Sequence, residues 1–314
     1  MKIKKPKFWD YKSPNIYSYF LIPISFIFQI INLLRKKSKF KYSTIKTICV
    51  GNIYIGGTGK TSLCIKIMEI LNKKKIKSCF IKKFYLDQVD EQKILRNKGK
   101  LFVSSKRTDA IYQAEKEGYQ VAILDDGLQD RSINYDLNFV CFNNINWIGN
   151  GLTIPAGPLR ENINSLQKYQ NVFLNGNLEN LENIKKYLHK MNQKVNVFVG
   201  KYNPLNLNEF NKNDRYLLFS GIGNHKTFVS MVKNSGLNVI KDIEFPDHYN
   251  YTNEDINRIL DQATNLNCKI ITTEKDYLRF EESKVDKIKC LKSELQIMNE
   301  EKLINIILKE NENN

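Results

Sequence analysis

The chain has 314 residues, with 49 Lys or Arg against 33 Asp or Glu, so its formal charge is 49 − 33 = +16. Its length allows one large or two ordinary domains. A hydrophobic share of 42% and a charged share of 26% are ordinary for a folded protein and exclude a disordered, collagen-like or polytopic membrane chain. The positive charge favours an anionic partner: nucleic acid, a phosphorylated ligand or an acidic membrane surface. The six cysteines are scattered singly, which predicts neither a disulfide framework nor a thiolate zinc site.

The first predicted element is an apolar helix over Ile16–Leu34, framed by basic residues on both sides. No small-residue cleavage site follows it, which excludes a secretory signal. At about 3.6 residues per turn, its polar residues fall on one narrow stripe. These residues are Ser18, Ser25, Gln29 and Asn32. The pattern favours, within residues 1–44, an amphipathic helix lying in an anionic membrane surface. A helix packed on the protein's own core and a membrane-spanning helix are the alternatives.

From Tyr42 onward, short β-branched or aromatic runs alternate with helical stretches, which is typical of parallel α/β units. The predicted strands are Ile45–Val50, Ser78–Phe84, Val121–Leu124, Leu137–Phe142, Asn171–Leu174, Val195–Val199, Arg215–Phe219, Asn238–Phe245 and Lys269–Thr273. The predicted helices are Thr61–Lys74, Thr108–Glu117, Lys226–Gly236, Asn253–Asn267 and Glu300–Lys309. A loop-like stretch near residue 202 divides residues 45–202, the first predicted domain, from residues 203–314, a second and smaller α/β domain.

The first predicted strand runs into a glycine-rich loop that opens a helix. Glycines let backbone N–H groups surround phosphates, the helix N-terminus adds positive potential, and Lys60 reaches the β- and γ-phosphates. The strict pattern GxxxxGK[ST] has glycine where this chain has Tyr54, but strand, loop and helix occur in the required order. We therefore predict a P-loop nucleotide site. Its predicted residues are Tyr54, Ile55, Gly56, Gly57, Thr58, Gly59, Lys60 and Thr61.

The strand Val121–Leu124 ends in two carboxylates, Asp125 and Asp126. In a parallel sheet this position lies at the same edge as the phosphate loop, where a Walker B acid meets the metal. We expect Thr61 and at least one of the two aspartates to hold Mg²⁺, directly or through water. The alternative interpretation is that Asp-Asp-Gly only forms a turn, which these residue types also favour.

Seven segments occur together in an order that no general pattern explains. They are Gly51-Asn52, Gly56-Gly57-Thr58-Gly59-Lys60-Thr61, Asp125-Asp126-Gly127-Leu128-Gln129, Pro155-Ala156-Gly157-Pro158-Leu159-Arg160-Glu161, Phe219-Ser220-Gly221-Ile222-Gly223-Asn224, Phe245-Pro246-Asp247-His248-Tyr249 and Thr272-Thr273-Glu274-Lys275-Asp276. In these segments the chain resembles the tetraacyldisaccharide 4'-kinases, the lipid A 4'-kinases of Gram-negative bacteria. The resemblance runs from the amino-terminal helix to about Phe280.

The resemblance implies transfer of the ATP γ-phosphoryl group to the 4'-hydroxyl of a tetraacylated glucosamine disaccharide 1-phosphate, at the cytoplasmic face of the inner membrane. It also implies two α/β/α domains with ATP in the cleft between them. The family's catalytic pair corresponds to Asp90, from Asp90-Glu91, and His248. Arg160 is then a candidate phosphate ligand, and Glu161 a candidate magnesium ligand.

The chain also departs from the family pattern. Where the family has Ser-Arg-Gly-Tyr-Gly, this chain reads Lys82-Lys83-Phe84-Tyr85, so that either lysine is a candidate to supply lost phosphate contacts. Asp130 stands where the family has histidine. A degenerate kinase without lipid turnover is the corresponding alternative.

Two other classes of protein compete with the kinase. A membrane-associated P-loop ATPase switch is one, although partitioning ATPases carry a second lysine where this chain has Ile55. A nucleic-acid-binding protein rests on charge alone, and no nucleic-acid motif is found, so we expect no nucleic-acid partner. The expected partners are an acylated disaccharide phospholipid and an anionic membrane surface, and no obligate protein partner is evident.

Overall fold

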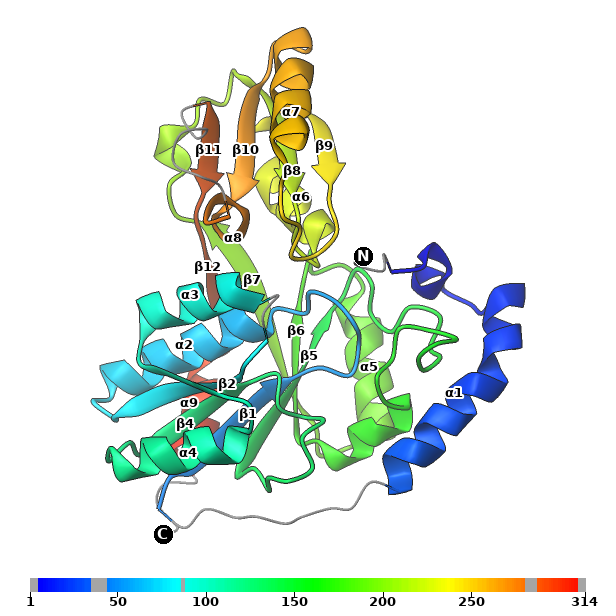
Figure 1. Ribbon diagram of the computed structural model, residues 1–314, viewed down its shortest axis with the longest axis vertical. Coiled ribbons are helices and arrows are strands. Elements are labelled where there is room, and N and C mark those ends of the chain that lie inside the picture. The colour runs from blue at the N-terminus through cyan, green and yellow to red at the C-terminus, as the bar shows by residue number, and fades with distance from the viewer. Residues whose placement is uncertain (1–4, 35–43, 86–87, 280–286, 310–314) are drawn as a thin grey trace. The chain divides into compact units, whose positions relative to one another are not determined.

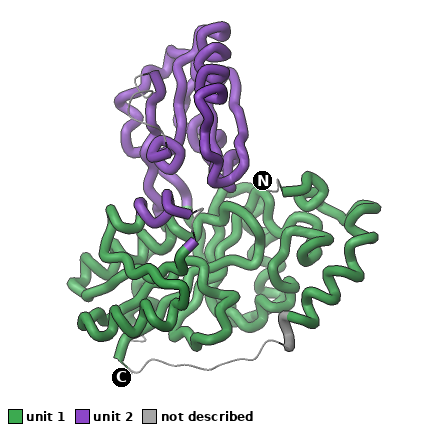
Figure 2. Tube along the Cα trace, viewed as in Figure 1, with its two compact units in different colours: residues 1–84, 95–200, 297–314 green, residues 85–94, 201–296 purple. Residues whose placement is uncertain are grey.

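The computed structural model describes residues 5–34, 44–85, 88–279 and 287–309 (Figure 1). They fall into two compact units: unit 1 holds residues 1–84, 95–200 and 297–314, and unit 2 holds residues 85–94 and 201–296 (Figure 2). The main division thus falls at residue 200, beside the predicted 202. The C-terminal helix belongs to unit 1, because Lys66 forms an ion pair with Glu300 and Lys46 Nζ donates to the Ile307 carbonyl.

The two sheets account for all the strands that the structure describes. The larger sheet has the order β12-β7-β6-β5-β1-β4-β2-β3, and the smaller has the order β11-β10-β8-β9. The pairings β1–β4, β1–β5, β2–β3, β2–β4, β5–β6, β6–β7, β8–β9, β8–β10 and β10–β11 are parallel, as the alternating sequence pattern predicts. The strands are β1 (Lys46–Gly51), β2 (Ser78–Lys83), β3 (Leu101–Ser104), β4 (Val121–Asp125), β5 (Leu137–Asn143), β6 (Asn171–Asn175), β7 (Asn196–Pro204), β8 (Arg215–Ser220), β9 (Asn238–Glu244), β10 (Lys269–Thr273), β11 (Ile288–Leu291) and β12 (Ser293–Ile297).

The helices among the described residues follow most of the predicted ranges. They are α1 (Ile16–Leu34), α2 (Lys60–Lys73), α3 (Val89–Lys98), α4 (Arg107–Lys116), α5 (Leu181–Met191), α6 (His225–Asn234), α7 (Asn253–Asn265), α8 (Glu274–Tyr277) and α9 (Glu300–Lys309). The sequence missed β3, β11, β12 and α8, which have only four or five residues, and α3, whose residues are too polar to show an apolar stripe.

The centre of unit 1 is a fully buried parallel sheet. Both faces of β1 and β4 are covered, since their residues read as near-continuous buried runs. One face packs against α4 through Ile81, Leu124 and Ile111, and α2 also contacts β1, β2 and β4. Because side chains alternate along a strand, Lys82 and Asp125 point to the face opposite Ile81 and Leu124. The carboxyl ends of β1, β2 and β4 therefore present polar groups at one edge of an apolar core.

Unit 2 contains its own core around the four-stranded sheet. Phe219 of β8 lies in an aromatic group with Phe245, Tyr249 and Tyr251, in mostly edge-to-face contacts. Helix α7 packs on the same core and begins with a capping box, in which Thr252 accepts from the Asp255 N–H and Asp255 accepts from the Thr252 N–H. This core fixes the loop that follows β9, which carries His248.

Helix α1 has the predicted bounds, and it contacts unit 1 through its polar stripe. Ser18 Oγ accepts from Asn150 Nδ2 at 3.0 Å, Ser25 Oγ donates to the Thr153 carbonyl at 2.9 Å, and Gln29 Nε2 donates to Thr153 Oγ1 at 2.9 Å. Ser18 and Ser25 are buried. The helix therefore packs on unit 1, and it does so through its polar stripe.

The apolar side of α1 points away from unit 1. Phe20 is 76% exposed and Phe26 is 62% exposed, and neighbouring isoleucines and tyrosines are exposed as well. The side chain of Asn32 and the flanking residues 35–43 lie outside the described residues. Within the ranges that the structure describes, no helix is both long and apolar enough to cross a membrane.

Candidate active site

The glycine-rich loop of unit 1 leads from the end of β1 into α2. Gly56 and Gly59 have positive φ values of 127° and 76°, which glycine adopts without steric cost. Asn52 Nδ2 donates to Thr58 Oγ1 at 2.9 Å, and Asn175 Nδ2 donates to the Thr58 carbonyl at 2.6 Å. Both asparagines are fully buried. The buried amide side chains of Asn52 and Asn175 therefore hold the loop in its curved form.

Two of the predicted loop residues contact protein. Tyr54 is 2% exposed, and its hydroxyl donates to Asp10 Oδ1 at 2.6 Å. Burial, then the hydrogen bond and charge of Asp10, raise the pKa of Tyr54 well above its usual range. The N–H of Ile55 donates to the Pro158 carbonyl at 2.9 Å. The side chain of Tyr54 thus anchors the loop entrance to the N-terminal segment.

Asp126 follows β4 and carries two cationic neighbours. Its φ of 59° is left-handed, a conformation that aspartate tolerates. Arg160 Nη1 lies 2.9 Å and 3.1 Å from its two carboxylate oxygens, and Lys60 Nζ lies 3.9 Å from Oδ1. Burial opposes ionisation, but Lys60 and Arg160 outweigh it and lower the pKa of Asp126 below its ordinary value. The structure thus brings together three of the predicted site residues.

Asp125, the last residue of β4, pairs with a residue that the sequence did not single out as its partner. Lys82 Nζ lies 2.6 Å from Asp125 Oδ2, with both side chains almost fully buried. Thr61 Oγ1 donates to the same oxygen at 3.3 Å. Asp125 Oδ1 is also buried, and within the described part of the chain it has no hydrogen-bond partner.

Glu161 joins this group through an amide side chain. Gln129 Nε2 donates to Glu161 Oε1 at 3.0 Å, and Gln129 Oε1 accepts from Arg160 Nη1 at 3.1 Å. Tyr169 donates to the other Glu161 oxygen at 3.3 Å. Gln129 ends the segment Asp125–Gln129, and no specific role for its side chain follows from the sequence. In the structure this side chain links Arg160 to Glu161. We call Lys60, Thr61, Lys82, Asp125, Asp126, Gln129, Arg160 and Glu161 the loop cluster.

Asp130 contributes to the turn that carries Asp126 through a contact with Arg107. Its carboxylate accepts from Arg107 Nη1 at 3.3 Å, while Arg107 Nη2 donates to the Asp126 carbonyl at 2.6 Å. Arg107 is 7% exposed. Asp130 thus balances the charge of a buried guanidinium that holds the turn after β4.

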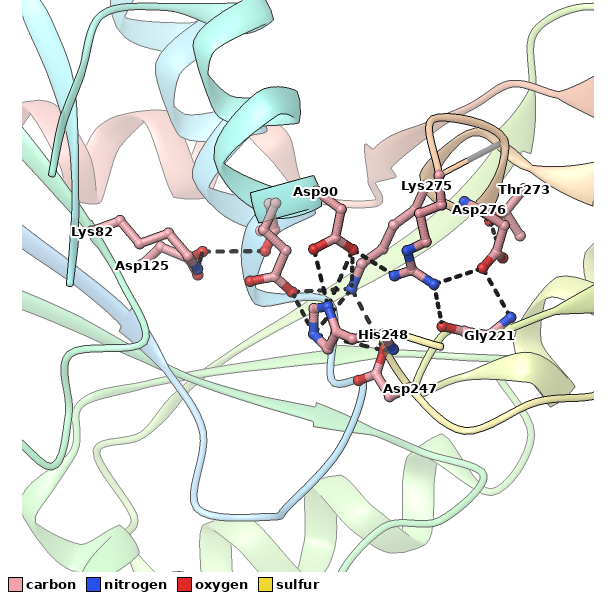
Figure 3. Close-up of polar contacts among 12 residues, drawn as sticks. Lys82, Asp90, Asp125, Gly221, Asp247, His248, Thr273, Lys275 and Asp276 are labelled. Atoms are coloured by element: carbon pink, nitrogen blue, oxygen red, sulfur yellow. Dashed lines mark hydrogen bonds and ion pairs between the residues drawn. The ribbon is translucent and has the colours of Figure 1, made fainter. Parts of the chain in front are cut away.

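A second group of charged residues lies entirely in unit 2 (Figure 3). Asp90 is at the start of α3 and His248 is in the loop after β9, 158 positions away in the chain. His248 Nδ1 lies 3.0 Å and 3.1 Å from the two oxygens of Asp90. A carboxylate at this distance accepts a hydrogen bond from Nδ1, so Nδ1 carries a proton. In the neutral imidazole the lone pair is then on Nε2. His248 has φ 57°, an uncommon value for histidine in a left-handed turn.

Lys275 is surrounded by carboxylates in the same group. Its Nζ lies 3.1 Å from Glu91, 3.5 Å from Asp247 and 3.7 Å from Asp90, and it also lies 3.4 Å from His248 Nε2. Burial disfavours its charge, but the three carboxylates prevail and raise the pKa of Lys275 above its ordinary value. The lysine is therefore a fixed positive charge beside the imidazole.

Arg279 links Asp90 to the rest of unit 2. Its Nη2 donates to Asp90, and its Nη1 donates to the Gly221 carbonyl at 2.9 Å and to Asp276 Oδ1 at 2.8 Å. Burial raises the pKa of Asp90, but the hydrogen bond from His248, the charge of Lys275 and the hydrogen bond from Arg279 together hold it well below its ordinary value. We call Asp90, Glu91, Asp247, His248, Lys275 and Arg279 the dyad cluster.

Lys275, Arg279 and Arg107 received no role from the sequence, which offered a signal for only the first of them. Lys275 lies in the quoted segment Thr272–Asp276, so a role for it was within reach. Arg279 is three residues beyond that segment, and Arg107 begins a helix with no distinctive pattern. Both act through contacts with residues distant in the chain, which sequence spacing does not reveal.

Residues 17–100 and 86–312 match the tetraacyldisaccharide-1-P 4'-kinase family. The chain is 58% identical over 314 residues to the tetraacyldisaccharide 4'-kinase of Pelagibacter ubique (strain HTCC1062), covering all of both chains. It is 34% identical over 331 residues to that of Rickettsia bellii (strain OSU 85-389), covering 98% of this chain and 99% of the relative. The structure resembles LpxK from Aquifex aeolicus, crystallised in complex with ATP, with a TM-score of 0.68, 22% identity, and coverage of 94% of this chain and 99% of that one.

The depressed pKa of Asp90 predicts how stability depends on pH. Above its ordinary value of 3.8, Asp90 is ionised in both states and its contacts stabilise the fold in full; below that value this contribution is lost as the pH falls towards the folded pKa. Between about pH 4 and pH 2, we expect the free energy of unfolding to fall more steeply in the wild type than in Asp90→Asn. Urea denaturation at several pH values measures both slopes. The exposed Asp261→Asn is the control and should follow the wild type, whereas equal slopes for Asp90→Asn would contradict the assignment.

Proposed function

The chain belongs to the tetraacyldisaccharide-1-P 4'-kinase family, and on this premise we propose that it phosphorylates the 4'-hydroxyl of a tetraacyldisaccharide 1-phosphate, using ATP. The 4'-oxygen forms a bond to the γ-phosphorus while the bond to the β,γ-bridging oxygen breaks, giving ADP and the 4'-phosphorylated lipid A precursor, lipid IVA. The observation that carries this proposal is the formed phosphate loop beside the acidic end of β4. The relatives do not favour a nucleotide-controlled switch.

The loop cluster supports the binding of ATP. Lys60 at the start of α2 and the loop N–H groups supply positive potential for the phosphates, as at other helix N-termini. Arg160 adds a guanidinium that is already aligned on Asp126. That LpxK from Aquifex aeolicus was crystallised with ATP supports the same nucleotide here.

The oxygen atoms of the loop cluster fit Mg²⁺ carried in by a nucleotide. In the described residues no group of three or more His, Cys, Asp or Glu forms a complete metal site. Mg²⁺ usually takes one or two carboxylates together with substrate phosphates, so such a partial set suits it. Thr61, Asp125, Asp126 and Glu161 would hold the ion, and the buried Asp125 Oδ1 needs a partner. When bound, Mg²⁺ neutralises charge on the phosphoryl oxygens.

The dyad cluster supports the acceptor side of the reaction. Asp90 orients His248 through Nδ1, so that Nε2, the ring nitrogen that Lys275 also approaches, is the atom that would take the proton of the 4'-hydroxyl. Arg279 keeps Asp90 ionised, and an ionised partner stabilises the imidazolium that forms. The pair Asp90–His248 thus acts as one base, with the proton residing on the imidazole.

The exposed apolar side of α1 supports contact with an anionic membrane. Phe20 is 76% exposed beside several exposed isoleucines, and contact of so large an apolar surface with water is unfavourable. A helix in the membrane interface buries such side chains among the acyl chains, and the net charge of +16 attracts anionic lipids. We therefore place the protein peripherally at the cytoplasmic face of the bacterial inner membrane, where an acylated disaccharide phospholipid resides.

Transfer of labelled phosphate from ATP to tetraacyldisaccharide 1-phosphate in mixed micelles tests the function. We expect product from the wild type, with losses of about 10²-fold or more in His248→Ala, which lacks the base, and in Lys60→Ala, which lacks a phosphate ligand. His189→Ala in α5 and Lys73→Ala at the far end of α2 are matched controls and should keep wild-type rates. Absence of lipid product from wild-type protein that binds ATP would overturn the proposal.

Sedimentation with vesicles containing anionic lipid tests the role of α1. Burying each phenylalanine contributes about 1.5–3 kcal/mol, so Phe20→Ser/Phe26→Ser should lower vesicle binding by about 10²-fold or more. Tyr112→Ser, which removes an exposed aromatic from α4, is the control and should bind like the wild type. Equal binding by the Phe20→Ser/Phe26→Ser variant would show that α1 does not enter the lipid.

A further inference from the structure

Lys82 is the most deeply buried lysine that the described residues place near the phosphate loop. It is 2% exposed, in a strand whose preceding residues are all buried. Strands β2 and β4 pair with Lys82 directly opposite Asp125, so the contact follows from the register of the sheet. A shift of one residue would turn the lysine into the apolar α4 face, which the core forbids.

The two carboxylates at the end of β4, Asp125 and Asp126, lie nearest to different cations. Asp126 is contacted by Arg160 and Lys60, whereas Asp125 is contacted by Lys82 at 2.6 Å. Thr61, a predicted metal ligand, donates to the Asp125 oxygen that Lys82 also contacts. Lys82 therefore places a positive charge on Asp125, at the edge of the sheet where a nucleotide-bound metal ion would also place one.

The two oxygens of Asp125 have different surroundings. Oδ2 is engaged by Lys82 and Thr61, while Oδ1 is buried and lacks a hydrogen-bond partner among the described residues. Leaving a buried carboxylate oxygen without a partner is costly, which indicates that a ligand completes this side. A buried carboxylate with no counterion at all would be costlier still.

We propose that Lys82 is a positioning residue of the nucleotide site, which neutralises Asp125 in the absence of a divalent cation and holds its Oδ2, so that Oδ1 is the oxygen that meets Mg²⁺. This inference rests on the proposed function for its ligand. It also implies that the protein without nucleotide needs no Mg²⁺ for its stability.

Thermal unfolding without nucleotide, with EDTA or with MgCl₂, tests the proposal. The wild-type melting temperature should change by less than about 1 °C on adding MgCl₂. Lys82→Met, which leaves Asp125 uncompensated, should melt about 5–10 °C lower in EDTA and recover at least half of that loss in MgCl₂. Lys83→Met, at the neighbouring position of β2, is the matched control and should show no response to Mg²⁺. No Mg²⁺ response in Lys82→Met, or the same response in wild type, would overturn the proposal.

The double variant Lys82→Met/Asp125→Asn keeps the test decisive if Lys82→Met does not fold. Removing both charges abolishes the uncompensated carboxylate, so the double variant should fold and melt without a response to Mg²⁺. A double variant that is as unstable as Lys82→Met would show that Lys82 acts through something other than Asp125.

ATP titration by calorimetry separates this inference from the proposed function. We expect removal of Mg²⁺ to weaken ATP binding about tenfold more in Lys82→Ser than in the wild type, because the variant depends on the metal to neutralise Asp125. An equal effect of Mg²⁺ on both proteins would contradict the inference. A wild type that does not bind ATP would instead overturn the proposed function, while the melting experiment would still decide the role of Lys82.

Discussion

The parallel pairing of β1, β2 and β4 is the constraint on which the loop cluster depends. In a parallel sheet all carboxyl ends lie at one edge, so the glycine loop after β1, Lys82 at the end of β2 and Asp125 at the end of β4 meet without any sequence proximity. The register is rigid because both faces of these strands are buried, and a slip would exchange the apolar and polar positions. The chemistry of the edge is thus a consequence of the packing of the core.

Charge balance within each unit is the second organising feature. Every carboxylate of the loop cluster and of the dyad cluster contacts a cation, an imidazole or a hydrogen-bond donor. Burial would otherwise favour the neutral forms, and the partners reverse this preference for Asp90 and Asp126. Such networks define one arrangement of side chains, because removing one member leaves another charge uncompensated.

Local patterns in the sequence predicted the elements that depend on local order. The phosphate loop, the acidic end of β4, the α/β alternation and the bounds of α1 all follow from contiguous residues. The pairing of Lys82 with Asp125 did not, because it depends on which strands are neighbours and in which register. The contact of Arg279 with Asp90 joins residues 189 positions apart, for which spacing carries no signal. The sequence also could not predict which face of α1 contacts the protein, because a polar stripe can face either water or protein. In the structure, buried hydrogen bonds to Asn150 and Thr153 show that the stripe faces the protein.

The central claim is that the chain transfers phosphate to one particular hydroxyl group of a lipid. Phosphorus–proton correlation NMR of the lipid product, made by the wild-type protein from ATP and tetraacyldisaccharide 1-phosphate, tests it most directly. The account predicts a new phosphomonoester signal coupled to the proton on the 4' carbon, with the original 1-phosphate signal retained. A new phosphate coupled to any other position, or phosphate released only as inorganic phosphate, would contradict the account.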